Sequence, residues 1–174
     1  MKPIILFVFC ALFGFAGLAQ VSSAEEDFIL NNVALNQLGN VARINQIGDF
    51  NEVNILQDNI QYAELLQQGD FNVMQARMTG TRNSLKLVQD GDNNSYELAL
   101  DGDNNILGVI QRGYNNVLLQ EMDKTDNRLL YLLQDGNNNY LEYRENDSFQ
   151  PDLPLQITQE GQGLQLIINP KNHN

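Results

Sequence analysis

The stretch QIGDFNEVNILQ, residues 46–57, determines the fold that we expect for this chain. It begins and ends with glutamine, and Gly and Asn stand at its third and sixth places. The same pattern, Q-x-G-x-x-N, occurs five times, as Gln46-Gly48-Asn51, Gln67-Gly69-Asn72, Gln89-Gly91-Asn94, Gln111-Gly113-Asn116 and Gln134-Gly136-Asn139. The opening glutamines are 21, 22, 22 and 23 residues apart. A fixed period in this range predicts an architecture of stacked repeats.

A looser copy of the pattern lies between successive strict copies, so the smallest unit is about eleven residues. Met78-Gly80-Asn83 and Leu100-Gly102-Asn105 keep the Gly and the Asn. Met122-Lys124-Asn127 lacks the Gly, and Gln57-Asn59-Tyr62 lacks the final Asn. Each repeat of about 22 residues therefore holds two units.

Within each unit apolar side chains alternate with period two, which predicts a strand with one buried face. The residues two places after each Asn position are expected to face the core, and they are Val53, Met74, Leu85, Tyr96, Leu107, Leu118, Leu129 and Leu141. Two places further come Ile55, Ala76, Leu87, Leu98, Val109, Gln120, Tyr131 and Tyr143, of which only Gln120 is strongly polar. The opposite face is mixed and includes Glu52, Glu97 and Arg128.

Four residues rich in Gly, Asp and Asn separate the strands, and these residue types favour turns. The pattern predicts ten strands, at 40–46, 51–57, 62–67, 72–78, 83–89, 94–100, 105–111, 116–122, 127–134 and 139–145. A proline-containing break at 146–154 precedes one degenerate last repeat within 155–168. We therefore expect an all-β fold, a β-solenoid of about five two-strand layers with a degenerate C-terminal layer.

The recurring Gln and Asn lie on the core face, at the two ends of each strand where the chain bends. An unpaired interior amide costs roughly 2–7 kcal/mol. Stacked on an identical residue at the ~4.8 Å strand spacing, each amide can donate to one neighbour and accept from the other. The period supplies the same residue in every layer, so we expect ladders of these side chains, with the turn glycines beside them.

Residues 1–24 are typical of a secretory signal peptide, with Lys2 before an apolar run and cleavage after Ala24 or, alternatively, Ala19. Residues 25–36 form an N-terminal segment, 37–145 the repeat region and 146–174 the break, last repeat and tail. The mature chain has no cysteine, since Cys10 lies in the signal. It carries 9 Lys and Arg against 22 Asp and Glu, a formal charge of −13. That acidity argues against nucleic acid as a partner.

The repeat from Asn40 to Asn51, with Ala42, Ile44 and Gln46 between them, resembles the curlin repeat Q-x-G-x-x-N-x-A-x-I-x-Q. That repeat builds the subunits of curli, the extracellular amyloid fibres of bacterial biofilms. The resemblance covers residues 36–145 and implies a secreted subunit that folds as it joins a cell-surface fibre. It also implies partners: copies of itself, other curlin-repeat subunits and a curli-type outer-membrane secretion apparatus.

The chain departs from the curlin pattern in ways that leave its role open. Positions 78, 100, 122 and 145 carry Met, Leu or Glu in place of Gln, and the Ala of the pattern is mostly a larger apolar residue. A principal subunit, a nucleator and an accessory subunit all remain open. Stacked Asp residues in the turns, such as Asp49 and Asp70, suggest control of assembly by charge or simply good turn chemistry.

Two other classes of function are weighed against a fibre subunit. A monomeric solenoid with capped ends would act as an adhesin or binding module. An enzyme is disfavoured, because the only histidine is His173 and no nucleophile–base pair is available. The segment 90–94 begins like a calcium loop but lacks its glycine at the sixth place, which disfavours a dedicated calcium site. We expect no cofactor, metal or small-molecule substrate.

Overall fold

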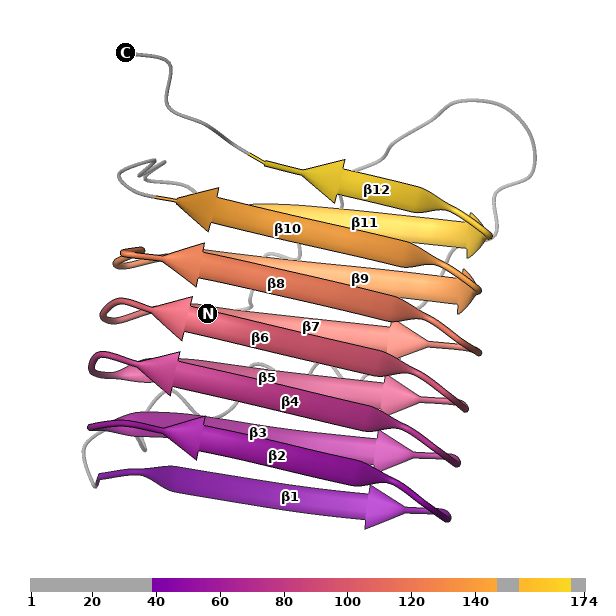
Figure 1. The fold of residues 1–174 in the computed structure, drawn as a ribbon, viewed down its shortest axis with the longest axis horizontal. Helices are drawn as coiled ribbons and strands as arrows, with labels where there is room; N and C mark the ends of the chain where they lie inside the picture. Colours follow the sequence, from indigo (N-terminus) through magenta and orange to yellow (C-terminus); the bar gives the residue numbers. More distant parts are fainter. Residues whose placement is uncertain (1–38, 147–153, 170–174) are drawn as a thin grey trace, which may run out of the picture.

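The computed structural model describes residues 39–146 and 154–169. These residues form twelve strands and no helix. The strands are β1 (Val41–Ile47), β2 (Glu52–Gln57), β3 (Gln61–Gln68), β4 (Val73–Thr79), β5 (Asn83–Asp90), β6 (Ser95–Asp101), β7 (Ile106–Arg112), β8 (Val117–Asp123), β9 (Leu129–Asn137), β10 (Tyr140–Asn146), β11 (Leu155–Gln162) and β12 (Gln165–Ile168). The expected β-solenoid is confirmed (Figure 1).

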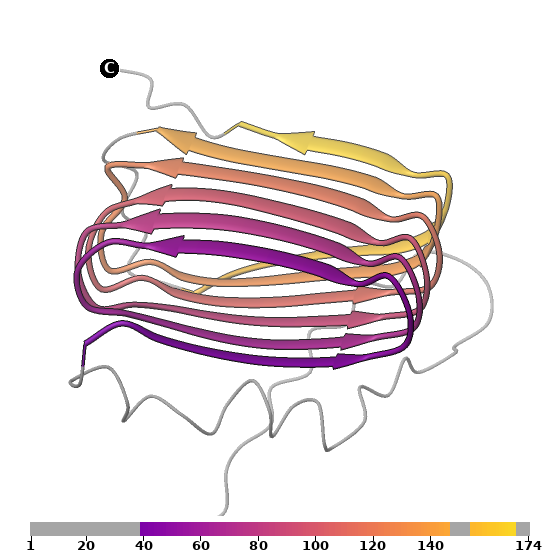
Figure 2. The same ribbon diagram turned by 60° about the horizontal axis from the view of Figure 1, so that its bottom comes forward.

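The strands lie in two parallel six-stranded sheets that face each other. The odd-numbered strands run in the order β1-β3-β5-β7-β9-β11, and the even-numbered strands β2 to β12 form the other sheet in the same sense. Each odd strand and the even strand after it make one layer, so the described chain forms six layers. Figure 2 shows the chain coiling from one sheet to the other through a bend at each side.

The core fills the space between the two sheets. The inward side chains of neighbouring layers stand over one another, as the register of Leu85 with Leu107 and of Leu107 with Leu130 illustrates. The core cluster consists of Ala63, Leu65, Met74, Ala76, Met78, Leu85, Leu87, Tyr96, Leu98, Leu100, Leu107, Val109, Leu118, Met122, Leu130, Leu132, Leu141, Tyr143 and Ile157. Burial of this continuous apolar column is the main force that holds the layers together.

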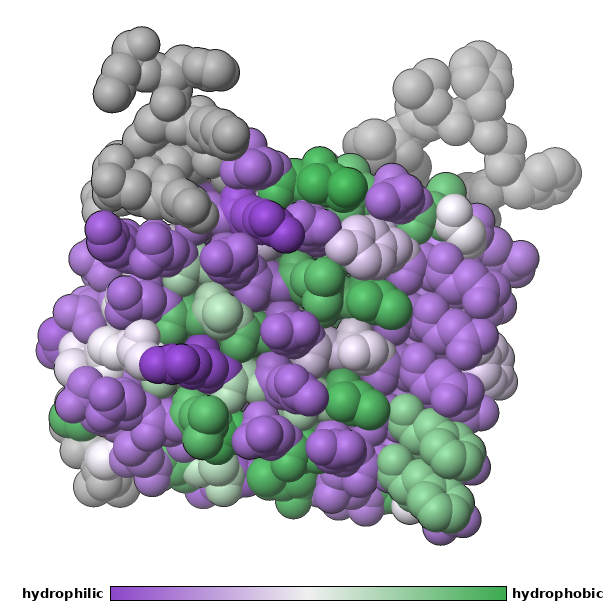
Figure 3. Space-filling model, viewed as in Figure 1, coloured by the Kyte–Doolittle hydropathy of each residue, from purple (hydrophilic) through white to green (hydrophobic). Residues whose placement is uncertain are grey.

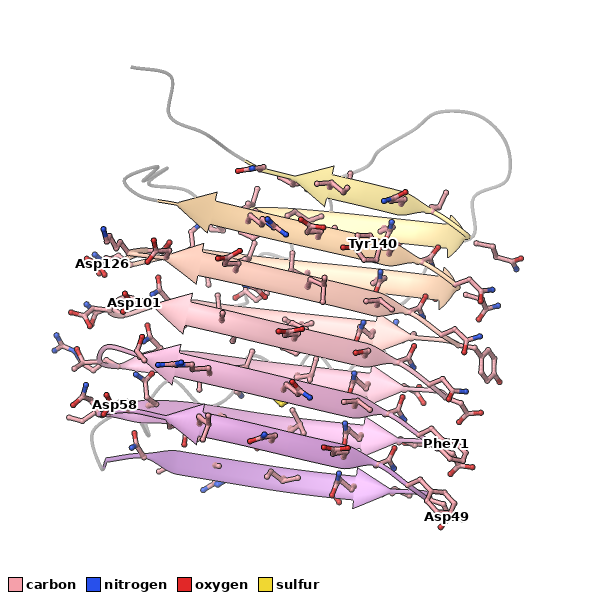
Figure 4. All side chains as sticks on the ribbon, viewed as in Figure 1. Asp49, Asp58, Phe71, Asp101, Asp126 and Tyr140 are labelled. Carbon is pink, nitrogen blue, oxygen red and sulfur yellow. The ribbon has the colours of Figure 1, made fainter. Side chains whose placement is uncertain are left out.

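The outward face of the even strands is mixed, as expected. In Figure 3 hydrophilic and hydrophobic side chains alternate over this face, and the bend at the right is mostly hydrophilic. One hydrophobic patch lies at the lower right corner, where Figure 4 labels Phe71.

Nine of the ten expected strands lie within one residue of their predicted ends, and β9 is the exception. Leu129 and Tyr131 were expected to face the core, and this is wrong: Leu130 and Leu132 are buried there instead. The reason is a bend one residue longer than expected, which puts Arg128 rather than Asn127 at the Asn position, paired through its N–H with Asn105. Because side chains alternate along a strand, a shift of one residue exchanges the faces.

The placement of Tyr62 at an Asn position is also wrong. Gln61 is in register with Asn83, and Tyr62 is in register with Ser84 on the outward side. The bend before β3 is one residue shorter than the bends before β5 and β7, so β3 begins one residue earlier than predicted. The expected position of Arg128 on the outward face is corrected by the same argument, since its side chain is buried.

Candidate functional site

The five predicted glutamines lie in one column along the inner end of the odd strands, together with Gln159 of the last layer. Each Nε2 donates to the Oε1 of the glutamine in the next layer: Gln46 to Gln67 at 2.8 Å, Gln67 to Gln89 at 2.7 Å, Gln89 to Gln111 at 2.8 Å, Gln111 to Gln134 at 2.9 Å and Gln134 to Gln159 at 2.9 Å. All are buried except Gln46 at the edge. The column is thus a continuous hydrogen-bonded chain of amides with one polarity.

The second N–H of the glutamine amide ties the odd sheet to the even sheet. The Nε2 of Gln111 donates to the carbonyl of Ser95 at 3.0 Å, and that of Gln134 to the carbonyl of Val117 at 3.0 Å. These carbonyls belong to the first residue of an even strand in the preceding layer. Each glutamine therefore satisfies a backbone group at the bend as well as its neighbour in the column.

The asparagines form a second column, but most of their bonds go to the backbone rather than to one another. The Oδ1 of Asn94 accepts from the N–H of Asn116 at 3.1 Å, and the Nδ2 of Asn94 donates to the carbonyl of Gly113 at 2.8 Å. The same two bonds recur from Asn51, Asn72, Asn116 and Asn139 to the layer that follows each of them. Asn is one methylene shorter than Gln, so its amide reaches the adjacent main chain. The expectation of amides stacked on identical amides thus describes the glutamines better than the asparagines.

The turn glycines allow the layers to approach closely at this bend. A Cβ placed on Gly48, Gly69, Gly91, Gly113 or Gly136 would lie 1.8 to 2.2 Å from the carbonyl oxygen of the glycine in the next layer. All five also have positive φ values, between 96° and 119°. No other residue type meets both conditions.

Aspartates after the turn glycines bond the backbone of the layer before them. The Oδ1 of Asp70 accepts from the N–H of Asp49 at 2.7 Å, and the Oδ1 of Asp92 accepts from the N–H of Asp70 at 2.8 Å. Figure 4 shows Asp49 and Phe71 at one bend and Asp58, Asp101 and Asp126 at the other. These contacts give Asp70 and Asp92 a structural reason to be present, so they support the turn interpretation over charge control.

The opposite bend carries a buried charged cluster that the sequence pattern did not predict. Arg128 takes the Asn position, and its Nε lies 3.2 Å from the Oε2 of Glu145, which takes the Gln position. Arg128 also donates to the Tyr143 hydroxyl at 3.0 Å, and that hydroxyl donates to Glu145. Burial, followed by the hydrogen bond to Glu145, raises the pKa of Tyr143. The sequence did indicate this cluster, because Arg128 and Glu145 are charged at repeat positions that carry amide or apolar residues in the preceding layers.

A second buried polar pair lies between the sheets. The Tyr96 hydroxyl donates to the Oε1 of Gln120 at 2.8 Å, which explains the one polar residue on the otherwise apolar face. Burial raises the pKa of Tyr96 well above its ordinary value, so this hydroxyl stays a donor at neutral pH.

Each end of the stack is an open edge within the described chain. At the first layer the core itself is exposed, since Ile44 of β1 is 49% exposed although it points inward. At the last layer the equivalent Ile157 is only 7% exposed. Phe50 and Phe71 stack beside the β1 edge with ring centroids 4.9 Å apart and rings 8° from parallel. The first layer thus exposes a strand edge and core side chains, and beside them Phe50 stacks on Phe71 of the second layer.

Within residues 39–146 and 154–169 no group of three or more His, Cys, Asp or Glu side chains is arranged to hold a metal ion. No helix in this part of the chain is long and apolar enough to cross a membrane. The expected signal peptide and His173 lie outside the described residues. Compared with known proteins, the chain matches no family model, no curated protein and no solved structure.

The structure brings together all ten predicted ladder residues and all five predicted glycines at a single bend. Their role in assembly stays a prediction. At each end of the stack, backbone groups and a glutamine amide lie at the edge. Another layer with the same pattern could form hydrogen bonds with them.

Proposed function

We propose that this chain is a secreted structural subunit that self-assembles into extracellular, curli-type amyloid fibres for adhesion and biofilm matrix. The observation that carries the proposal is the open first layer. Ala42, Ile44 and Gln46 point into the core yet are exposed, because no layer precedes β1 in the described chain. An edge that exposes core residues and unpaired backbone invites pairing with another chain.

The backbone at the β1 edge is arranged to accept a further strand. The carbonyl of Ile47 accepts from the N–H of Gly69, so Ile47 points its backbone groups toward β3. By the alternation of a strand, Ile44 and Gln46 point theirs toward the open edge. A parallel strand added there would continue the ladder and the glutamine column by β-augmentation.

A test uses the mature chain, residues 25–174, held at neutral pH without denaturant. We expect thioflavin fluorescence to rise after a lag, the lag to shorten when preformed fibres are added, and diffraction from aligned fibres to show a reflection at about 4.7–4.8 Å. A monodisperse monomer that persists for days at high concentration would contradict the proposal.

The second candidate, a monomeric adhesin or binding module, has an observation in its favour. β12 is only four residues long, and Pro154 stands immediately before β11. Short edge strands and prolines are devices that hinder pairing at an edge. They act on the last layer alone, whereas the first layer has a seven-residue edge strand. We therefore favour the fibre subunit.

A further inference from the structure

The last layer differs from the five before it at one position of the asparagine column. Leu164 stands where the other layers carry Asn, and its own N–H donates to the Oδ1 of Asn139 at 3.0 Å. The side chain of Leu164 is 42% exposed and has no hydrogen-bonding group to offer to a layer beyond it.

Every asparagine of the column makes two bonds to the layer that follows. For Asn116, the Oδ1 accepts from the N–H of Asn139 at 3.1 Å, and the Nδ2 donates to the carbonyl of Gly136 at 2.7 Å. Both bonds depend on the side chain of the earlier layer. A layer that follows Leu164 would therefore lack both of them.

At other positions of the described residues, the first layer of a second copy fits the last layer. Continuing the register by one layer would place Gln46 of the second copy on Gln159, Ile44 on Ile157 and Val53 on Leu166. The polarity is also correct, because each glutamine donates toward the C-terminal end and the described residues hold no glutamine that donates to the Oε1 of Gln46. The Nε2 of Gln159 donates to the carbonyls of Tyr140 and Leu164, so the N–H now on Leu164 would turn to the incoming Gln46. Amide would meet amide, and apolar side chain would meet apolar side chain.

The mismatch at Leu164 falls on two polar groups of the incoming copy. Its Asn51 N–H would find no Oδ1, and its Gly48 carbonyl would find no Nδ2. The Leu164 side chain also occupies the space concerned, since a Cβ built on Gly161 meets its Cδ1 at 3.0 Å, where earlier layers hold the carbonyl of the next glycine. Leaving buried backbone groups unpaired weakens an interface.

We infer that Leu164 is a specificity residue at the junction between copies, which weakens head-to-tail stacking of this chain on itself. The inference rests on the proposed function, because it concerns the strength of the contact that would build the fibre. By the same chemistry, the β1–β2 edge pairs more strongly with a layer that carries Asn at this position than with the last layer of its own copy.

The experiment compares the mature wild-type chain with Leu164→Asn, which supplies both missing groups. Ile167→Asn is the matched control, since Ile167 is also exposed, lies in the same layer and points outward. The concentration of chain that stays soluble in equilibrium with fibres measures the strength of the junction. We expect Leu164→Asn to lower it about tenfold, which two recovered hydrogen bonds would give, and Ile167→Asn to leave it within about twofold.

The outcomes separate this inference from the proposed function. If the wild type forms fibres and Leu164→Asn leaves the same concentration of chain soluble, the inference alone is overturned. The same holds if Leu164→Asn and Ile167→Asn lower that concentration equally. If neither the wild type nor Leu164→Asn forms fibres, the proposed function fails and the inference fails with it. If only Leu164→Asn forms fibres, the inference is supported and the native chain is not a self-assembling subunit.

Discussion

At the scale of single residues, this structure depends on buried polar side chains. Each of them can be buried because it forms a hydrogen bond to the same residue type, or to the backbone, of an adjacent layer. The 22-residue spacing was sufficient to predict the glutamine column. It was not sufficient to predict that Asn94 would bond Gly113 and the N–H of Asn116, because the reach of a side chain at a bend depends on the turn conformation. Periodicity reports which residues stack, and side-chain length decides which atoms meet.

Gln111 lies in the middle of its column and offers a direct test of the column's contribution to stability. Gln111→Ala removes its bonds to Gln134 and Ser95 and takes from the Nε2 of Gln89 one of its two acceptors, leaving only the carbonyl of Val73. We expect the free energy of unfolding to fall by about 2–4 kcal/mol, because buried groups are left unpaired. Denaturant unfolding of the freshly prepared monomer measures it.

The control for this change is Gln46→Ala at the open edge. Gln46 is exposed and makes one bond in the column, to Gln67, so its removal should cost less than about 1 kcal/mol. Equal losses for the two variants would contradict the idea that buried stacking, rather than the residue type, supplies the stability.

Gly113 tests the close approach of the layers separately from backbone strain. A Cβ at Gly113 would lie 2.1 Å from the carbonyl oxygen of Gly136, and its φ is +96°. Gly163 also has a positive φ, +65°, but nothing lies within 4 Å of a Cβ placed there. We expect Gly163→Ala to cost about 1 kcal/mol through strain, and Gly113→Ala to cost about 3 kcal/mol or more because the layers must separate. Thermal unfolding of both variants decides the matter, and similar melting temperatures would show that strain alone requires the glycine.

At the scale of strands and bends, the strand positions were predictable and the register of two of them was not. Alternation identifies a strand, but the bends before β3 and β9 differ from the others by one residue, and period two cannot reveal in which bend a residue is gained or lost. The structure resolves the ambiguity through Gln61 and Arg128, which occupy the Asn position in those layers. Tyr131 consequently faces outward, although its apolar character fits either face.

The buried cluster of Arg128, Glu145 and Tyr143 belongs to this scale, because it joins the bend before β9 to β10. Glu145→Met inserts the residue that the neighbouring layer carries at the same position, Met122. It also leaves the buried Arg128 without its carboxylate. We expect a loss of about 3–5 kcal/mol in the free energy of unfolding, the usual effect of breaking a buried ion pair.

Removing the whole cluster provides the control for that prediction. The triple variant Arg128→Asn, Tyr143→Phe, Glu145→Met restores the asparagine and the methionine of the preceding layer, removes the hydroxyl and leaves no charge at these three positions. Replacement of a buried charged cluster by matched residues is often neutral or stabilising, so we expect most of the lost stability to return. A triple variant less stable than Glu145→Met would show that the cluster itself favours the fold.

At the scale of the whole molecule, the two ends of the stack are complementary but unequal. The first layer exposes its core and a seven-residue edge strand, and the last layer is more nearly closed and ends in a four-residue strand. The repeat predicted that there would be two ends. It did not predict their difference, which comes from the degenerate last repeat, where Leu164 replaces Asn and β12 is short.

Two proline variants test whether copies stack head to tail through these ends. Ile44→Pro removes an N–H that points to the open edge of β1. Thr158→Pro does the same at the open edge of β11. Thr158 is in register with Leu133 and, through the earlier layers, with Leu66 and Asn45. The backbone N–H and C=O groups of these residues point toward the following layer, so those of Thr158 point toward the open edge. Proline is tolerated at an edge position whose N–H is free, so both monomers should fold. Each variant alone should form no fibres, because every junction needs both edges.

A mixture of the two variants gives the decisive result. The intact β11–β12 edge of Ile44→Pro can bind the intact β1–β2 edge of Thr158→Pro, after which both remaining edges are blocked. Analytical ultracentrifugation of an equimolar mixture, above the soluble concentration measured for the wild type, should therefore show dimers and nothing larger, while each variant alone stays monomeric. Dimers of Thr158→Pro alone would instead mean that first layers pair with each other, and fibres in the mixture would mean that growth uses a surface other than the two ends.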